Sequence, residues 1–135
     1  MEPECQAGSP LSDYPVLDVA SALDHTGGDR ELLGQLCGVF MTECPAELQD
    51  VRAAVESGAP TPIQRTAHKL KGSTSVVGGV QASEAALRLE HAATGESPER
   101  IRACLEALQL AVAALLEQVR QLEQEIRSET GSSPS

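Results

Sequence analysis

Residues 97–126 read SPERIRACLEALQLAVAALLEQVRQLEQEI, the longest helical pattern in the chain. The large apolar residues of this stretch alternate spacings of four and three, as on one face of a helix in a left-handed bundle or coiled coil. They are Ile101, Leu105, Leu108, Val112, Leu115, Val119, Leu122 and Ile126. Ser97, Pro98 and Glu99 come directly before them, an order typical of a helix start. The stretch therefore predicts one long helix with a single buried face.

Four shorter helical patterns precede this stretch, separated by breaks that contain glycine or proline. We expect helices over about 17–25, from an Asp29 cap to about 57, from a Thr61 cap to about 77, and over about 80–93. The apolar spacing continues across Pro45, which predicts one kinked helix there. Pro62 and Gln64 strengthen the start at Thr61 as first-turn proline and capping box. Together the patterns predict an all-α fold, an antiparallel four-helix bundle with a short additional N-terminal helix.

The two ends of the chain are rich in Ser, Pro, Gly and Glu, a composition typical of tails. We expect a flexible N-terminal tail over 1–14, the bundle over 15–127 and a disordered C-terminal tail over 128–135. The 135 residues are enough for one such domain. The cysteines form no C-x-x-C pair, which favours free thiols, three of them buried on helices, over disulfides or a zinc site. They are Cys5, Cys37, Cys44 and Cys104.

The charge and hydropathy of the chain exclude several classes of partner. No apolar run approaches the roughly 20 residues that cross a bilayer, and the N-terminus lacks a signal-peptide pattern, so we expect a cytoplasmic protein without membrane insertion. The net charge is −10, from 20 acidic and 10 basic residues. An acidic chain is poorly suited to phosphate backbones, and one Tyr, one Phe and no Trp leave little to stack on bases. We expect no nucleic-acid partner.

One window of the chain departs from this acidic character. No Asp or Glu occurs from Ser57 to Ser83, whereas Arg65 and the only two lysines, Lys69 and Lys71, lie inside it. These three cations surround His68 in the sequence. The window predicts a small basic face that suits a phosphate group held on a side chain.

A helical wheel places His68 away from the core. Ile63, Leu70 and Val77 fall on the side opposite to it, where the apolar stripe of this helix would be buried. The residues within about 60° of His68 on the wheel are Gln64, Arg65, Lys71, Gly72 and Ser75. Glycine in a helix interior costs about 1 kcal/mol relative to alanine. Gly72, one turn after His68, therefore indicates that the imidazole is left uncovered for close approach by another protein.

The block from His68 to Gly78 resembles the H-x-L-K-G-S motif of histidine-containing phosphotransfer (HPt) domains. The matching residues are His68, Leu70, Lys71, Gly72 and Ser73, followed by Val77 and Gly78. The similarity extends over about 16–122 and includes Leu89 and Glu90, which match a Leu-Glu pair usual on the next helix. Val77 replaces the commoner Leu, and Lys69 stands at a variable position.

This resemblance implies a four-helix bundle whose exposed histidine carries a phosphoryl group between receiver-domain aspartates of a two-component phosphorelay. His68 would be phosphorylated, Lys71 would be its electrostatic partner and Gly72 would give access, with Lys69, Arg65 and Gln64 bordering the site. The implied partners are response-regulator receiver domains and a sensor or hybrid histidine kinase. No cofactor or metal is expected on this chain, since the receiver would bring Mg²⁺. The implied protein is a phosphocarrier without an ATP-binding domain, either free-standing or part of a larger kinase.

Other functions stay open on the sequence. The chain could be the phosphoacceptor domain of a chemotaxis-type kinase, a non-catalytic helical interaction module, or a coiled-coil dimerisation module built on the face of residues 101–126. We expect a monomer, with that face in its own core. His25 and His91 are expected to be structural or solvent-facing, and a zinc site made from the three histidines lacks ligand spacing. Docking of a partner is expected on apolar surface near His68, including Val16, Val19 and Ala20.

Overall fold

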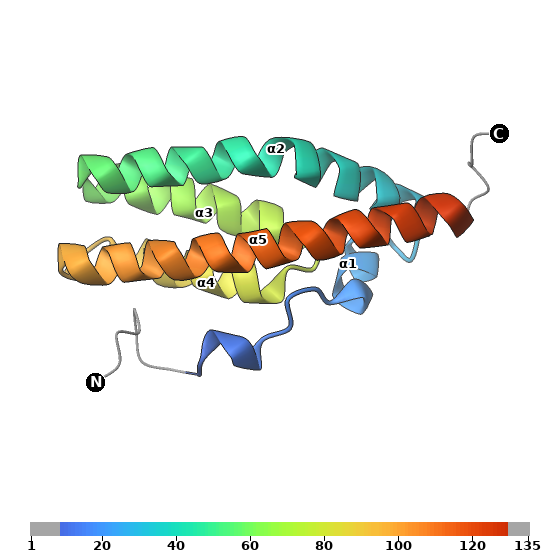
Figure 1. Ribbon diagram of the computed structural model, residues 1–135, viewed down its shortest axis with the longest axis horizontal. Coiled ribbons are helices and arrows are strands. Elements are labelled where there is room, and N and C mark those ends of the chain that lie inside the picture. Colours follow the sequence, from blue (N-terminus) through green and yellow to red (C-terminus); the bar gives the residue numbers. More distant parts are fainter. Residues whose placement is uncertain (1–8, 130–135) are drawn as a thin grey trace.

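The computed structural model describes residues 9–129, and within them every regular element is helical. A 3₁₀ turn and five α-helices follow one another along the chain: η1 (Leu11–Asp13), α1 (Val19–His25), α2 (Arg30–Ser57), α3 (Pro60–Val76), α4 (Val80–Ala92) and α5 (Pro98–Glu129). Helices α2 to α5 lie side by side and run alternately in opposite directions, with η1 and α1 to one side (Figure 1). The predicted antiparallel four-helix bundle with a short N-terminal helix is confirmed. No helix within these residues is long and apolar enough to cross a membrane.

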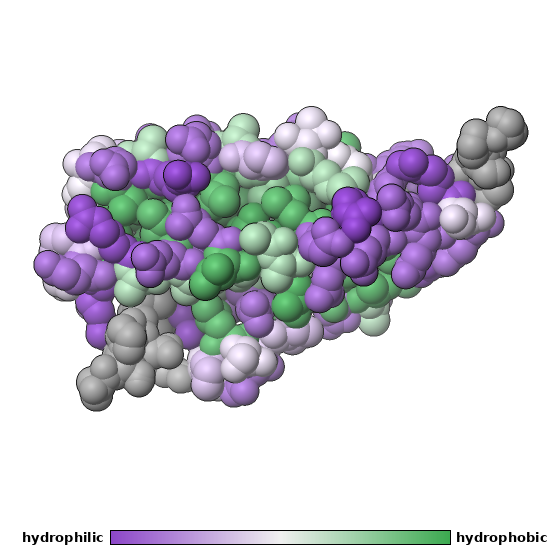
Figure 2. Space-filling model, in the orientation of Figure 1, coloured by the Kyte–Doolittle hydropathy of each residue, from purple (hydrophilic) through white to green (hydrophobic). Residues whose placement is uncertain are grey.

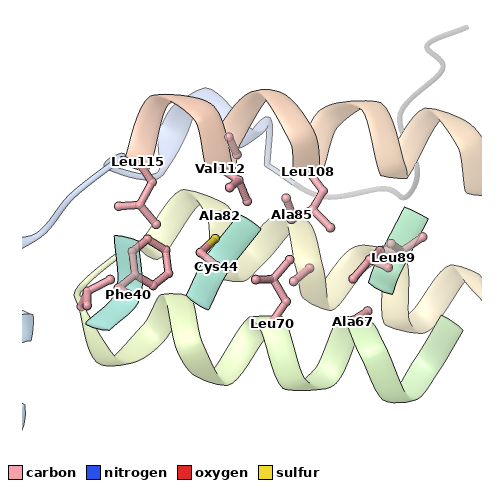
Figure 3. Packing of buried hydrophobic residues seen from close by; sticks show 14 of the residues in the cluster. Phe40, Cys44, Ala67, Leu70, Ala82, Ala85, Leu89, Leu108, Val112 and Leu115 are labelled. Carbon is pink, nitrogen blue, oxygen red and sulfur yellow. The ribbon is translucent and has the colours of Figure 1, made fainter. Parts of the chain in front are cut away.

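The four long helices form a closed ring of neighbours around one core. Helix α2 packs on α3 and α5, and α4 packs on the same two helices from the other side. Side chains from all four point into the space between them, as Phe40, Leu70, Leu89 and Leu115 do in Figure 3. Alanines such as Ala82, Ala85 and Ala86 fill the α4 side, where they let the helices approach closely.

The apolar face of α5 lies inside this core. Six of the eight residues predicted for that face are buried, and Ile101 and Leu105 are half-buried against the same cluster. The buried six are Leu108, Val112, Leu115, Val119, Leu122 and Ile126. They contact the chain's own helices, which leaves them no surface for a second chain. The outward face of the second half of α5 is mostly hydrophilic (Figure 2).

The helix boundaries match the sequence patterns with one correction. Helix α2 starts after the Asp29 cap, whose side chain accepts a hydrogen bond from the Leu32 N–H, and continues unbroken through Pro45. The predicted Thr61 cap of the next helix is wrong. Helix α3 starts two residues earlier than this cap implies, at Pro60, with Ala59 as its N-cap and no side-chain cap. Because Pro60 and Pro62 carry no N–H, two of the four unpaired donors at this end are already removed.

The N-terminal segment also differs from the predicted tail. Residues 1–8 lie outside the described part, but the segment from Ser9 packs along α4. The Gln81 side-chain amide donates to the carbonyls of Leu11 and Tyr14 at 3.0 and 3.1 Å. The Arg88 guanidinium, only 2% exposed, donates to the Ser9 carbonyl and stacks over the Tyr14 ring. Composition could not reveal these anchors, since they come from a helix about 70 residues later. The predicted C-terminal tail begins inside α5, and 130–135 lie outside the described part.

A tight turn at Gly78 and Gly79 connects α3 to α4 and sets how the two helices pack. Gly78 has a φ of +80°, and a side chain there would strike the Asp18 carbonyl oxygen at 2.3 Å. At Gly79 an added Cβ would come within 2.4 Å of Leu115. The hydroxyl of Ser83 on α4 lies 2.8 Å from those of both Thr74 and Ser75 on α3. These contacts hold the two helices in a single register.

Candidate functional site

His68 stands in the middle of α3 on its outer side. Its neighbours Ala67 and Leu70 are fully buried, whereas 66% of the His68 side chain is exposed. The orientation predicted from the helical wheel is therefore confirmed. The backbone of α3 is held by the core underneath, so the imidazole is presented to solvent from a rigid support.

A carboxylate from the neighbouring helix holds one side of this ring. The Nδ1 atom of His68 lies 3.2 and 3.4 Å from the two carboxylate oxygens of Glu90 on α4. The Lys71 ammonium lies 3.5 Å from the same carboxylate, so Glu90 is shared between the ring and the lysine. Side chains of Glu90 and Lys71 are mostly covered, at 22% and 29% exposed. With a carboxylate at Nδ1, the favoured neutral tautomer carries its proton on Nδ1, and Nε2 keeps a lone pair.

The sequence did not assign Glu90 a role, because the acid-free window around His68 suggested a purely basic face. The antiparallel packing of α3 against α4 brings Glu90 next to His68. His68 and Glu90 lie eleven residues before and after Gly79, the centre of the turn. Residues at equal distances from a tight helix-to-helix turn lie side by side, so counting outward from the glycine pair would have found this contact. The same count pairs Ser75 with Ser83, which do touch.

The structure places the other predicted site residues in two groups. Lys71 joins the His68 and Glu90 contact, as described above. Arg65 and Lys69 are exposed and Gln64 is half-buried, and no hydrogen bond or ion pair joins them to His68 within residues 9–129. Gly72 is exposed, and a Cβ added there would meet nothing within 4 Å. The surface beside His68 is thus open, and the exposed cations Arg65 and Lys69 lie near it on the same helix.

The remaining histidines and the thiols lie apart from this site. His25 and His91 are exposed. Among the described residues no group of three or more His, Cys, Asp or Glu could hold a metal ion. Cys37, Cys44 and Cys104 are buried free thiols, as predicted, and Cys5 lies outside the described part. Burial raises the pKa of Cys37 to about 11 and that of Cys44 to about 12, so both stay protonated and unreactive at neutral pH.

Comparisons with known proteins agree with this arrangement. The family model described as "Hpt domain" matches residues 35–128, which include α3, α4 and His68. The fold is similar to the crystal structure of histidine-containing phosphotransfer protein B (HptB) from Pseudomonas aeruginosa PAO1, with a TM-score of 0.74 and 23% identity. That similarity covers 82% of this chain and 96% of the other. The comparison with curated proteins gave no match. The chain belongs to the Hpt family, phosphocarriers that exchange phosphoryl groups with receiver domains and histidine kinases in two-component phosphorelays.

Proposed function

We propose that His68 is the residue that carries the phosphoryl group, and that Nε2 is the atom to which it is bound. The observation that supports this is the pairing of an exposed ring with Glu90 at Nδ1. A ring held in this way has its lone pair on the solvent side. Within residues 9–129, Nε2 makes no hydrogen bond that would occupy that lone pair.

The transfer follows from this placement. The Nε2 lone pair attacks the phosphorus of an aspartyl phosphate on a receiver domain in line with the bond to the aspartate oxygen. The N–P bond forms, the P–O bond to the aspartate breaks, and the aspartate leaves as a carboxylate. The ring, still protonated at Nδ1, becomes positively charged, and the Glu90 carboxylate stabilises that charge. The reverse sequence returns the group to a receiver, whose own carboxylates would bind the Mg²⁺ that the reaction needs.

Lys71 stabilises the phosphorylated form of His68. A phosphoryl group on His68 adds about −1.5 to −2 charges next to a carboxylate. An ammonium about 4 Å from a unit charge, at an effective dielectric near 20, offsets up to about 4 kcal/mol before desolvation. The Lys71 side chain is already held at the site by Glu90. A small rotation takes its ammonium from that carboxylate to the phosphoryl oxygens, which stabilises phosphohistidine long enough for transfer.

Replacing Glu90 tests its role as a positioning residue. We expect Glu90→Ala to slow phosphoryl uptake about tenfold or more, on the order of what loss of a charge-assisted hydrogen bond costs. Glu90→Gln should recover part of this, because its carbonyl still accepts from Nδ1. ¹⁵N NMR of the imidazole should show the Nδ1–H tautomer in the parent and a mixture in Glu90→Ala. An unchanged tautomer and an unchanged rate in Glu90→Ala would contradict the role.

A larger side chain at Gly72 tests access to the ring. Gly72→Leu should raise the KM for a phosphorylated receiver by about tenfold or more, because the leucine occupies the open surface one turn from His68. The fold should become more stable by about 1 kcal/mol, since glycine is a poor helix former and the new Cβ meets nothing. Gly38→Leu on α2, where an added Cβ also meets nothing, is the matched control. Equal KM values for the two variants would exclude the access role.

Label transfer tests the proposal as a whole. The protein is incubated with a receiver domain carrying ³²P on its aspartate, and the product is treated with acid or base. We expect label on this chain that acid removes and base leaves, as for a phosphoramidate. Label that survives acid, or none from any phosphorylated receiver that labels other HPt proteins, would contradict the proposal.

A further inference from the structure

Residues 9–18, which we call the strap, are hydrogen-bonded to α4 and to the turn that precedes it. The Gln81 N–H donates to the Pro15 carbonyl at 2.9 Å, in addition to the two bonds of the Gln81 side chain. Where the strap ends, the Asp18 N–H donates to the Gly78 carbonyl at 2.8 Å. The η1 turn, which is part of the strap, lies beside α4 in Figure 1. Of the helices in the described part of the chain, α4 is the one on which η1 packs.

The strap and His68 contact opposite faces of α4. Ser83 and Glu90, seven residues apart, form the face toward α3, where they contact hydroxyl groups of that helix and the His68 ring. Gln81 and Arg88, also seven residues apart, form the face toward the strap. Arg88 and Glu90 are two residues apart, which places them about 200° apart around the helix axis. Helix α4 is therefore clamped between the strap and α3.

The side of α4 that faces the core is built mainly from alanine. Its buried apolar residues are one leucine, Leu89, and four alanines, Ala82, Ala85, Ala86 and Ala92. An alanine removes much less apolar surface from water than a leucine does, so it contributes less to holding the helix in place. The predicted face of α5, by contrast, buries six large apolar residues. Helix α4 therefore depends more than α5 on contacts outside the core, such as those with the strap.

Arg88 links the burial of a charge to the presence of the strap. Its guanidinium is 2% exposed, and Nε lies 3.1 Å from the Glu84 carboxylate. Two further contacts come from the strap: the Ser9 carbonyl and the Tyr14 ring, whose centroid is 5.9 Å from Cζ. A buried cation lowers stability unless hydrogen bonds and an opposite charge compensate its loss of water. The strap supplies part of that compensation, so its docking stabilises Arg88 and α4 together.

We propose that Gln81 and Arg88 are positioning residues for phosphoryl transfer, because by holding the strap they keep α4 where Glu90 reaches Nδ1 of His68. This inference rests on the proposed phosphocarrier function. When the strap is released, α4 moves more freely and the contact between Glu90 and the ring is broken more often. A larger fraction of the ring then carries its proton on Nε2, and that fraction has no lone pair there to attack phosphorus. Receiver binding is unaffected, because the strap lies on the opposite face of α4 from His68.

An isosteric change tests Gln81. Gln81→Glu keeps the size of the side chain but replaces the donor to the Leu11 and Tyr14 carbonyls with a carboxylate, which repels them. Gln109→Glu adds the same charge at a half-buried position in the groove between α2 and α5, and it is the matched control. We expect Gln81→Glu to lower kcat for transfer from a phosphorylated receiver about threefold, within the range that weakening of one hydrogen bond gives, with KM unchanged. The control should keep both values.

A pair of changes at Tyr14 tests the contact with Arg88. Tyr14→Ala removes the ring under the guanidinium, whereas Tyr14→Phe keeps an aromatic face in the same place. We expect the alanine variant to lower kcat about twofold or more, since a cation over an aromatic ring is worth a modest free energy, and the phenylalanine variant to match the parent. Both variants leave the backbone carbonyl of Tyr14 in place for Gln81.

Two measurements on the unphosphorylated protein separate positioning from a general loss of stability. Amide hydrogen exchange should become faster in α4 than in α2 and α5 when Gln81→Glu or Tyr14→Ala releases the strap. ¹⁵N NMR of His68 should show a larger fraction of the Nε2–H tautomer in the same two variants. Ile126→Val, a change in the core of α5 beside Gly34, is the comparison. It should lower the melting temperature without changing the tautomer or kcat.

Unchanged exchange of the α4 amides in both strap variants would overturn the inference. Faster exchange with an unchanged tautomer and kcat would also overturn it, as would a raised KM with kcat unchanged, which would place the strap at the receiver contact. An equal fall of kcat in Ile126→Val would reduce the effect to global stability and contradict positioning. Absence of label on the parent protein would instead overturn the phosphocarrier proposal, whereas exchange and NMR would still report whether the strap holds α4.

Discussion

The His68→Gln variant should take up no acid-labile phosphate from a phosphorylated receiver domain. Glutamine has no nitrogen lone pair that can attack phosphorus, so we expect complete loss of transfer rather than a slower rate. The fold should be unaffected, because the ring is 66% exposed and, within residues 9–129, its one polar side-chain contact is with Glu90. The free energy of unfolding should change by about 0.5 kcal/mol or less, as for other surface substitutions. Label uptake and thermal unfolding by circular dichroism measure both effects.

His91→Gln is the matched control for that variant. His91 is an exposed histidine at the end of α4, the helix that also carries Glu90. The same substitution there should leave both label uptake and stability unchanged. Retention of label by His68→Gln, or its loss in His91→Gln, would show that His68 is not the acceptor.

The Leu115→Asp variant should be unfolded at 25 °C. Leu115 is fully buried, and its side chain lies so close to Gly79 that a methyl group there would not fit. Truncation of a buried leucine costs about 2–5 kcal/mol, and a buried carboxylate without a partner adds several more. Domains of this size have a total stability of about 5–15 kcal/mol. Circular dichroism should show loss of the cooperative helical transition.

Leu110→Asp provides the comparison on the same helix. Leu110 is 74% exposed, so an aspartate there stays in water, and the variant should keep its helical signal and its melting transition. Sedimentation of the two variants also tests the coiled-coil alternative. If Leu115→Asp converted a helical dimer into a helical monomer, the face of residues 101–126 would join two chains, contrary to its burial in the bundle.

The sequence predicted the bundle well because its periodicity reports directly on burial. The spacing along α5 identified six residues that are buried, and the wheel through His68 correctly separated Leu70 from the exposed ring. Both arguments depend on the geometry of one helix. Local geometry alone is sufficient for such positions.

Contacts between two separate elements could not be predicted from the periodicity of either one. Glu90 reaches His68 only because the turn at Gly78 and Gly79 sets the register of α3 against α4. Gln81 and Arg88 anchor the N-terminal segment, and the groups that they contact in that segment are backbone carbonyls and the Tyr14 ring. Backbone carbonyls occur at every residue, so no sequence pattern marks them as acceptors.

The position of the phosphate on the parent protein tests the central claim most directly. The protein is labelled by a phosphorylated receiver, digested at neutral pH and mapped by mass spectrometry, and ³¹P–¹H NMR identifies the nitrogen that is bound. We expect a single phosphate on His68 at Nε2, with Nδ1 still directed to Glu90. Phosphate on His25, His91 or a hydroxyl side chain, or on Nδ1 of His68, would contradict it.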